Sequence, residues 1–309
     1  MYHYVHDREP TASHGVGGLA VGEFRRQLDQ LCDVMEPIDW PTIYAWMQGR
    51  RTIPDRCFML TFDDGLADHV NTVLPILEER ELRGVFFVPG EVLATEHLLA
   101  ANAIHVLLST LDADRLWDEL LRSLADCPDG IDWAGRLDRK AAERLYHYED
   151  PKRAHLKYLL TMELPVDLRS EILRALFERH VGSMTRWSRS WYLKWADLIR
   201  MASLGHTIGG HGYAHEPYRQ LSPEQQTADV GQAAAVLRDG LGTDIRPFSY
   251  PYGSFDDHVI GVCRDAGFAQ GFTTERGWIT RSCDPFRLPR VDTIDVDAVL
   301  REAFTCAQV

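Results

Sequence analysis

The sequence predicts an α/β fold with a parallel sheet, on three observations. Apolar strand-like runs alternate with amphipathic helical segments in two parts of the 309-residue chain, an order typical of parallel sheets. The polar clusters come directly after the expected strands, where barrels and open α/β sheets place their active sites. Between the two parts, residues 93–190 show only helical periodicity.

The N-terminal part supplies two expected strands and one helix. Residues 57–62 form a short apolar run that stops at Asp63, as expected of a buried strand. Residues 72–80 carry apolar side chains at helical spacing, and a second apolar run covers residues 85–88. A strand, a helix and a strand in this order predict a parallel pair.

The C-terminal part repeats this order. Ser222, followed by Pro223 and Gln225, has the pattern of a helix N-cap with a proline in the first turn and a capping glutamine. Gly205 and Gly267 follow two other amphipathic segments and indicate helix ends. The expected helices cover residues 195–204, 222 to about 240–242, and 256–266, and the expected strands cover residues 206–208, 246–250 and 268–274.

Residues 93–190 contain no clear strand. Large apolar residues recur at helical spacing from Ile104 to Leu124 and again from Leu168 to Phe177. No Ser-, Gly- or Pro-rich linker brackets the stretch, and no repeat is evident. We therefore expect a single domain over residues 1–309 with a helical insertion packed on it.

The composition excludes several partners. Lys plus Arg number 33 and Asp plus Glu number 46, a formal net charge of −13, which argues against binding to nucleic acid or to anionic membranes. No window approaches the roughly 18 consecutive apolar residues of a membrane span. No secretion signal is evident, so we expect a cytoplasmic protein. The six cysteines form no Cys-x-x-Cys pair and are expected to be reduced core thiols.

Two adjacent carboxylates, Asp63 and Asp64, follow the first buried strand. Side chains alternate along a strand, so the two project in different directions, and one can bind a cation while the other stays free. For the dipeptide by itself, a helix N-cap with an additional acid near the helix dipole is the simpler interpretation.

A pair of histidines, His211 and His215, favours a metal site over that simpler interpretation. Residues four apart share a face of a helix, and a tight loop can also bring them together. Gly209 and Gly210 precede the pair and allow close approach of the backbone. With one carboxylate, the histidines form a set that leaves positions open for water and substrate, which is the form of a catalytic zinc site.

The third cluster is residues 248–253, Phe-Ser-Tyr-Pro-Tyr-Gly. Pro251 and Gly253 flank Tyr252 and predict a turn whose backbone N–H points into the pocket as an oxyanion donor. By itself, without the other two clusters, the segment is better explained as a simple aromatic turn.

Together the three clusters resemble the first three motifs of the polysaccharide deacetylase family, carbohydrate esterase family four. The motifs are residues 61–65 (Thr-Phe-Asp-Asp-Gly), His211-x-x-x-His215 and residues 250–253 (Tyr-Pro-Tyr-Gly), in that order. Residues 1–5, 24–28 and 275–278 also fit the family. The resemblance covers about residues 1–92 and 191–293 and leaves the helical insertion outside it.

The resemblance implies a distorted (β/α) barrel and metal-dependent removal of an N-acetyl, or occasionally O-acetyl, group from a sugar. Matched residue by residue, Asp64, His211 and His215 hold one divalent ion, with Zn²⁺ expected and Co²⁺, Ni²⁺ or Mn²⁺ as alternatives. Asp63 is then the general base that acts on water, and the backbone N–H of Tyr252 helps to hold the oxyanion.

The chain departs from the family pattern at two positions. Ser249 stands where many members carry an arginine that orients the base, and residues 288–292 lack the histidine that protonates the leaving amine. We expect Arg290 to orient the base instead, because a guanidinium pairs well with a carboxylate. An arginine cannot serve as the general acid at neutral pH. The proton for the leaving group then comes from the recycled base, from His3 or His69, or from water.

The expected substrate is an acetamido sugar that is nucleotide-linked, lipid-linked or a small glycoside, because a cytoplasmic enzyme does not meet wall polymer. Trp278, Trp187 and Trp191 are candidates for stacking on the sugar, with buried packing expected for at least one of them. We assign Trp278, together with Tyr252 and His3, to the substrate site.

Two other functions fit parts of the pattern. A non-catalytic sugar-binding descendant would explain the missing histidine, although binding alone does not require the free carboxylate of Asp63. An iron oxygenase with a two-His, one-carboxylate centre is the second alternative. It would usually need an antiparallel β-sandwich, which the alternation of strands and helices does not predict.

Overall fold

The computed structural model describes residues 1–7, 16–125 and 131–305. The chain forms two compact units. The first unit consists of Met1–Asp7, Gly18–Thr95 and the chain from Trp191 onward, and the second contains Glu96–Ser190. The expected assignment of residues 93–190 to an insertion within a single domain stays a prediction.

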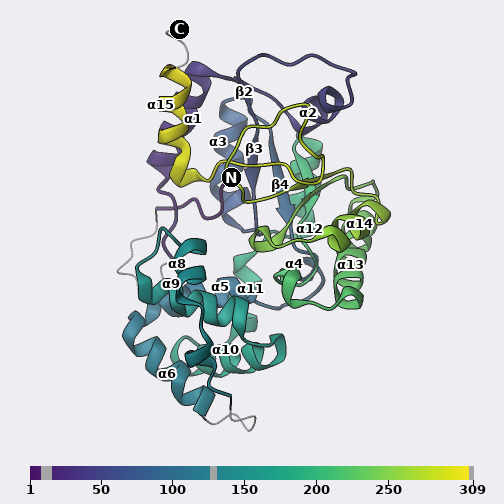
Figure 1. Cartoon of the computed structure of the whole chain (residues 1–309). Coiled ribbons are helices and arrows are strands. Elements are labelled where there is room, and N and C mark those ends of the chain that lie inside the picture. The colour runs from purple at the N-terminus through teal and green to yellow at the C-terminus, as the bar shows by residue number, and fades with distance from the viewer. Residues whose placement is uncertain (8–15, 126–130, 306–309) are drawn as a thin grey trace. The chain divides into compact units, whose positions relative to one another are not determined.

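The first unit is built on a parallel sheet, as the alternation of strands and helices predicts (Figure 1). Its five strands lie in sequence order: β3 (Leu60–Phe62), β4 (Gly84–Val88), β5 (Thr207–Gly210), β6 (Pro247–Ser249) and β7 (Gln270–Phe272). Single parallel bridges extend the sheet on both sides, from Phe62 to Tyr2 and from Phe272 to Leu288. Because its strands run in the same direction, the segments that follow them meet at one edge of the sheet.

Helices surround this sheet and connect its strands (Figure 1). They are α1 (Val21–Val34), α2 (Trp40–Met47), α3 (Leu74–Glu79), α4 (Glu91–Ala94), α12 (Trp195–Ser203), α13 (Pro223–Leu241), α14 (Asp257–Asp265) and α15 (Val296–Thr305). A π-helical turn covers His69–Val73, and 3₁₀ turns cover Tyr218–Gln220, Pro251–Gly253 and Thr293–Asp295. The capping box predicted from Ser222 and Gln225 is present at the start of α13.

Alternation along β4 places its side chains on two faces of the sheet. Phe86 stacks on Phe62 at 4.7 Å between ring centroids, and Phe62 packs edge-on against Phe24 of α1. The neighbouring Phe87 belongs to a different buried cluster, which includes Trp40 of α2. Both faces of the sheet are therefore covered, as is usual for parallel sheets.

The predicted strand at residues 57–62 is not continuous. It divides into β2 (Cys57–Phe58), which pairs with β1 (Glu36–Pro37) in a separate two-stranded sheet, and β3, which pairs with β4. An apolar run predicts burial but not the hydrogen-bonding partner, and here the partner changes at Met59.

The described part of the second unit contains helices and no strand. The helices are α5 (Ala100–Thr110), α6 (Ala113–Ala125), α7 (Trp133–Arg136), α8 (Arg139–Leu145), α9 (Pro151–Tyr158), α10 (Val166–His180) and most of α11 (Met184–Trp191), with a π-helical segment at Leu159–Glu163. Leu107, Leu120 and Leu173 are fully or almost fully buried, as their helical spacing predicts.

The cysteines only partly match the expected core thiols. Cys32, Cys57, Cys263 and Cys283 are free, and Cys127 and Cys306 lie outside the described residues. Cys263 is buried, but Cys32 is exposed, so the prediction of a core position is wrong for Cys32. Among the described residues, no helix is both long and apolar enough to cross a membrane.

Candidate active site

The three polar clusters meet at the carboxyl ends of the strands. Asp63 and Asp64 follow β3, His211 follows β5, and Ser249 is the last residue of β6. The parallel register aligns the ends of these strands, so residues from distant parts of the sequence come together.

Asp64, His211 and His215, here called the metal trio, lie close enough to bind one ion. Their ligating atoms all lie within 4.8 Å of one another, and the three side chains are buried. Asp64 Oδ1 is 3.2 Å from His215 Nε2 and 3.5 Å from His211 Nε2. His211 Nδ1 lies 2.7 Å from the carbonyl oxygen of Ser249, which can only accept, so Nδ1 carries the proton and Nε2 presents its lone pair. This donor set fits a divalent transition metal such as zinc.

The backbone of the site adopts conformations that cost free energy. Four non-glycine residues of the described chain have positive φ, and three of them lie in the predicted site: Asp64 at 77°, His215 at 56° and Tyr252 at 57°. Such conformations cluster at functional sites, where the surrounding structure enforces them. No local sequence signal predicts them, because glycine is the residue expected at positive φ.

Arg290 holds Asp63 in a bidentate ion pair. Its Nη1 and Nη2 each donate to one carboxylate oxygen at 2.8 Å. Its remaining N–H groups donate to the carbonyl oxygen of Thr273 at 2.8 Å, the hydroxyl of Ser249 at 2.8 Å and the hydroxyl of Thr61 at 3.4 Å. Arg290 thus contacts Asp63, the carboxylate that we expect it to orient, and that role stays a prediction.

Ser249 takes part in the same network, which the sequence analysis missed. Its hydroxyl accepts from Arg290 and donates to Asp63 Oδ2 at 3.1 Å. In the sequence, Ser249 is notable only as the position where an arginine is absent. The signal was its place at the end of a strand, where a small hydroxyl can bridge two larger polar groups.

The ionisation of the two carboxylates follows from these contacts. Burial by itself raises the pKa of Asp63, but the Arg290 guanidinium outweighs burial, and the pKa lies below its usual range. Burial likewise raises the pKa of Asp64, yet His215 and His211 hold it well below its usual range. Both carboxylates are therefore ionised at neutral pH.

Tyr252 and His3 border these groups. The Tyr252 ring lies 4.9 Å from the His215 ring, in the turn predicted from Pro251 and Gly253. The charge of His3 contributes to lowering the pKa of both carboxylates, Asp63 and Asp64, which places His3 near them.

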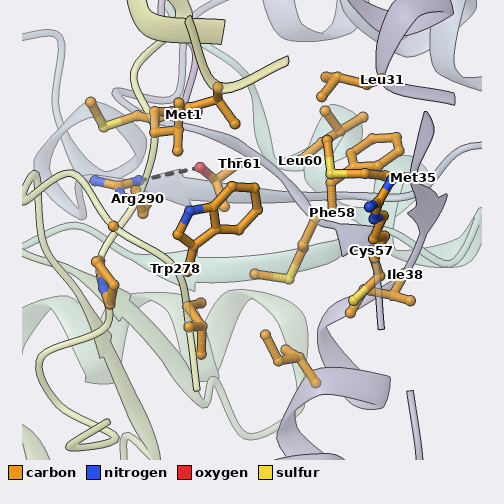
Figure 2. A pocket seen from close by; sticks show the side chains of 18 of the residues that line it. Met1, Leu31, Met35, Ile38, Cys57, Phe58, Leu60, Thr61, Trp278 and Arg290 are labelled. Carbon is orange, nitrogen blue, oxygen red and sulfur yellow. Dashed lines mark hydrogen bonds between the residues drawn. The ribbon is translucent and has the colours of Figure 1, made fainter. Parts of the chain in front are cut away.

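Trp278 lines a cavity of about 790 Å³ rather than the metal trio. Figure 2 shows Trp278 in the lining of this cavity, to which Thr61 and Arg290, joined by a hydrogen bond, also contribute. The other lining residues are mainly apolar, and none of the metal trio is among them. Trp191 is buried and packs edge-on against Tyr4, in agreement with the expected packing role for at least one tryptophan.

Glu91, at the first position of α4, has the most clearly raised pKa among the described carboxyl groups. Burial, followed by the charges of Glu216 and Asp229, raises it to about 7. Because this exceeds the unfolded value of about 4.5, the stability contributed by protonated Glu91 is complete below about pH 4.5 and lost as pH rises through about 7.

Substitution of Glu91 tests this linkage. We expect Glu91→Gln to gain stability relative to the unmodified chain between pH 4.5 and 8, by on the order of 1 kcal/mol after allowance for solvent screening of the part-exposed carboxyl. Urea denaturation at several pH values measures the difference. A difference that does not change with pH would contradict the assignment.

The fold and the site together define a class of protein. It is a (β/α) barrel with two histidines and one carboxylate at its strand ends, placed so that they could hold a metal ion. The chain belongs to the polysaccharide deacetylase family, whose model matches residues 50–126 and 165–271, well over half of its length. The family consists of carbohydrate deacetylases, which are hydrolases and in general metal-dependent. The match includes parts of the helical stretch, residues 93–126 and 165–190. The resemblance described above leaves this stretch out, because none of the motifs lies in it.

Curated relatives match short segments. The protein YxkH from Bacillus subtilis is 26% identical over 94 residues, which cover 30% of this chain and 34% of YxkH. Chitin deacetylase 1 from Cryptococcus neoformans is 33% identical over 63 residues, 20% of this chain and 13% of that protein. These alignments span about a third or less of each relative.

Solved structures match nearly the whole chain. The Streptococcus pyogenes deacetylase PplD, in complex with acetate, superposes with a TM-score of 0.59 at 14% identity and covers 94% of this chain and 88% of its own. IcaB from Ammonifex degensii superposes with a TM-score of 0.57 at 19% identity, and the match covers 98% of this chain and 94% of the IcaB chain. These similarities concern the fold, and they confirm the predicted distorted (β/α) barrel.

Proposed function

We propose that the protein removes the N-acetyl group of an acetamido sugar by metal-dependent hydrolysis at the metal trio. The observation that carries the proposal is the meeting of Asp64, His211 and His215 beside a second carboxylate that Arg290 holds separately. A structural metal site would not need a free ionised carboxylate next to it.

The chemistry divides between the trio and Asp63. A divalent ion bound by the trio, with Zn²⁺ expected, would lower the pKa of a water molecule and polarise the amide carbonyl of the substrate. Arg290 and Ser249 donate three hydrogen bonds to the Asp63 carboxylate, two of them to Oδ2. A carboxylate has about four lone-pair sites, so Oδ1 retains one that can accept a proton from water. Asp63 is the general base in this scheme.

We assign the oxyanion contact to the backbone N–H of Tyr252. Its left-handed conformation redirects the peptide in the short turn that follows β6, beside the metal ligand His215. A backbone donor held in this way requires no reorganisation as negative charge develops on the substrate oxygen.

We assign the proton for the leaving amine to His3 rather than His69. His3 is partly exposed and lies near both carboxylates of the site. His69 is fully buried against Phe62, and burial lowers its pKa to about 4, so it is neutral at pH 7. Its Nε2 faces the carbonyl oxygen of His3 at 3.1 Å, which suits a role in fixing the backbone of His3.

The alternatives receive less support. An iron oxygenase was expected on an antiparallel β-sandwich, whereas the five-stranded sheet of the described chain is parallel. A non-catalytic sugar binder gives no reason for the buried pairing of Asp63 with Arg290, because an ionised carboxylate is costly to bury without a chemical use.

The test is release of acetate from acetamido sugars. We expect incubation with Zn²⁺, Co²⁺ or Ni²⁺ to release acetate and an equal amount of free amine from a panel of N-acetyl sugars: chitooligosaccharides, nucleotide-linked sugars and small glycosides. An O-acetylated sugar serves as the control for the bond cleaved. Release of acetate only from the O-acetylated sugar would assign the protein to ester hydrolysis, and a bound metal without turnover would favour the sugar binder.

A further inference from the structure

Asp229, on α13, contacts the loop that joins the two histidines. Its Oδ1 accepts from the N–H of Tyr213 at 2.9 Å, and its Oδ2 accepts from the N–H of Ala214 at 2.8 Å. The hydroxyl of Tyr218 donates to Oδ1 at 2.8 Å and restrains the carboxylate. Asp229 is 9% exposed and Tyr218 is fully buried, so water competes little with these bonds.

The opposite side of the loop is fixed by backbone. The carbonyl oxygens of Gly212 and Tyr213 accept from the N–H groups of Gly90 and Glu91, at 3.0 and 2.9 Å. These donors lie at the start of α4, which follows β4. Asp229 therefore supplies the side-chain half of a clamp whose other half is main chain.

The loop needs such a clamp because it belongs to no helix or strand. Gly212 has φ of 69° and His215 has φ of 56°, so the backbone is held in conformations that it does not prefer. A Cβ at Gly212 would lie 2.9 Å from Asp229 Oδ1, which shows how closely the carboxylate approaches. Without an anchor, two histidines on such a loop have no fixed separation.

The charge of Asp229 also calls for an explanation. None of the ion pairs found among the described residues includes it, so a buried carboxylate is held by neutral donors alone. Only a carboxylate offers two acceptor oxygens to two successive N–H groups. An asparagine would place its NH₂ group against one of them and leave that buried N–H without a partner.

We propose that Asp229 is a positioning residue, which sets the geometry of His211 and His215 and thereby the affinity of the metal trio for its ion. The inference rests on the proposed function, since it takes the trio as the ligand set. Hydrogen-bond partners behind metal ligands typically change metal affinity by about 10- to 100-fold when they are removed.

Calorimetric titration of the metal-free protein with Zn²⁺ tests the proposal. We expect Asp229→Asn to bind Zn²⁺ about 10- to 100-fold more weakly than the unmodified chain. Asp229→Glu keeps both acceptor oxygens, so its affinity for Zn²⁺ should lie between that of Asp229→Asn and that of the unmodified chain. Asp39→Ala is the matched control: it removes the N-cap of α2, whose side chain accepts from the N–H of Thr42, on a helix away from the loop and from α13. It should lower Tm and leave the affinity within about twofold.

Hydrogen exchange of the metal-free protein gives a second readout. The amides of Tyr213 and Ala214 should exchange faster in Asp229→Asn, while amides in α14 should not. If Asp229→Asn does not fold, Asp229→Glu decides, with a loss of threefold or more in affinity expected. Unchanged affinity in the folded variants would overturn the positioning role. Absence of Zn²⁺ binding in the unmodified chain would overturn the proposed function instead, and the exchange rates would still report on the clamp.

Discussion

Asp64→Ala and His211→Ala are each expected to abolish metal binding and to lower acetate release by at least about a thousandfold. Each substitution removes one of the three side chains that the proposed site offers to an ion, whose candidate ligand atoms lie within 4.8 Å of one another. The two donors that remain cannot complete the set that a catalytic zinc site requires. Metal content after dialysis and acetate release from an N-acetyl sugar measure the two effects.

The control separates loss of the ligand from loss of the fold. His258→Ala removes an exposed histidine of α14, outside the metal trio, and should leave both metal content and rate unchanged. Asp64 and His211 are buried, so the melting temperature of each variant is measured without metal. Full activity in a folded Asp64→Ala or His211→Ala variant would contradict the proposed function.

Arg290→Met is expected to lower the free energy of unfolding at neutral pH by about 3–5 kcal/mol, because it leaves the Asp63 carboxylate buried without its partner. The pKa of Asp63 should then rise, since burial raises it and the guanidinium no longer offsets burial. In the unmodified chain the lowered pKa adds stability above the unfolded value of about 4, which is lost as pH falls. In the variant the contribution of Asp63 to the pH dependence of the free energy of unfolding changes sign, so stability is lost as pH rises.

Urea denaturation between pH 4 and pH 8 distinguishes the two directions in which the free energy of unfolding changes with pH. The deficit of Arg290→Met should be smaller at pH 4 than at pH 8, and the acid limb of kcat/KM should move to higher pH. Adding Asp63→Asn should restore part of the stability, since it removes the unpaired charge. Arg281→Met, which removes a cation 5.4 Å from the Trp46 ring, is the control and should cost about 1 kcal/mol or less. A deficit independent of pH would contradict the electrostatic assignment.

The ion pair of Asp63 with Arg290 shows where prediction from sequence needed the family. The two residues are 227 positions apart, and no periodicity links them. The expectation that Arg290 orients Asp63 rests on the absence of a motif arginine at Ser249. The hydroxyl bridge from Ser249 was not expected, because it depends on β6 ending beside the carboxylate.

Other residues show more clearly what could not be predicted from the sequence. Asp229 occupies a helical position with no distinctive pattern, yet it holds the loop between the histidines. Trp278 was assigned to the substrate site, and the structure places it in the cavity next to Arg290. The strand predicted at residues 57–62 was divided between two sheets, because an apolar run does not specify its partner.

The parallel α/β class, the helical nature of residues 96–190 where described, and a pair of histidines suited to a metal could be predicted without the structure. Each of these follows from local signals: short apolar runs, the helical period of 3.6 residues, helix caps, and histidines four residues apart. The structure was needed to show which side chains surround Asp63, how the loop between His211 and His215 is held, and which residues adopt positive φ. These features depend on contacts between residues that are distant in sequence and meet at the strand ends, and no local pattern encodes such contacts.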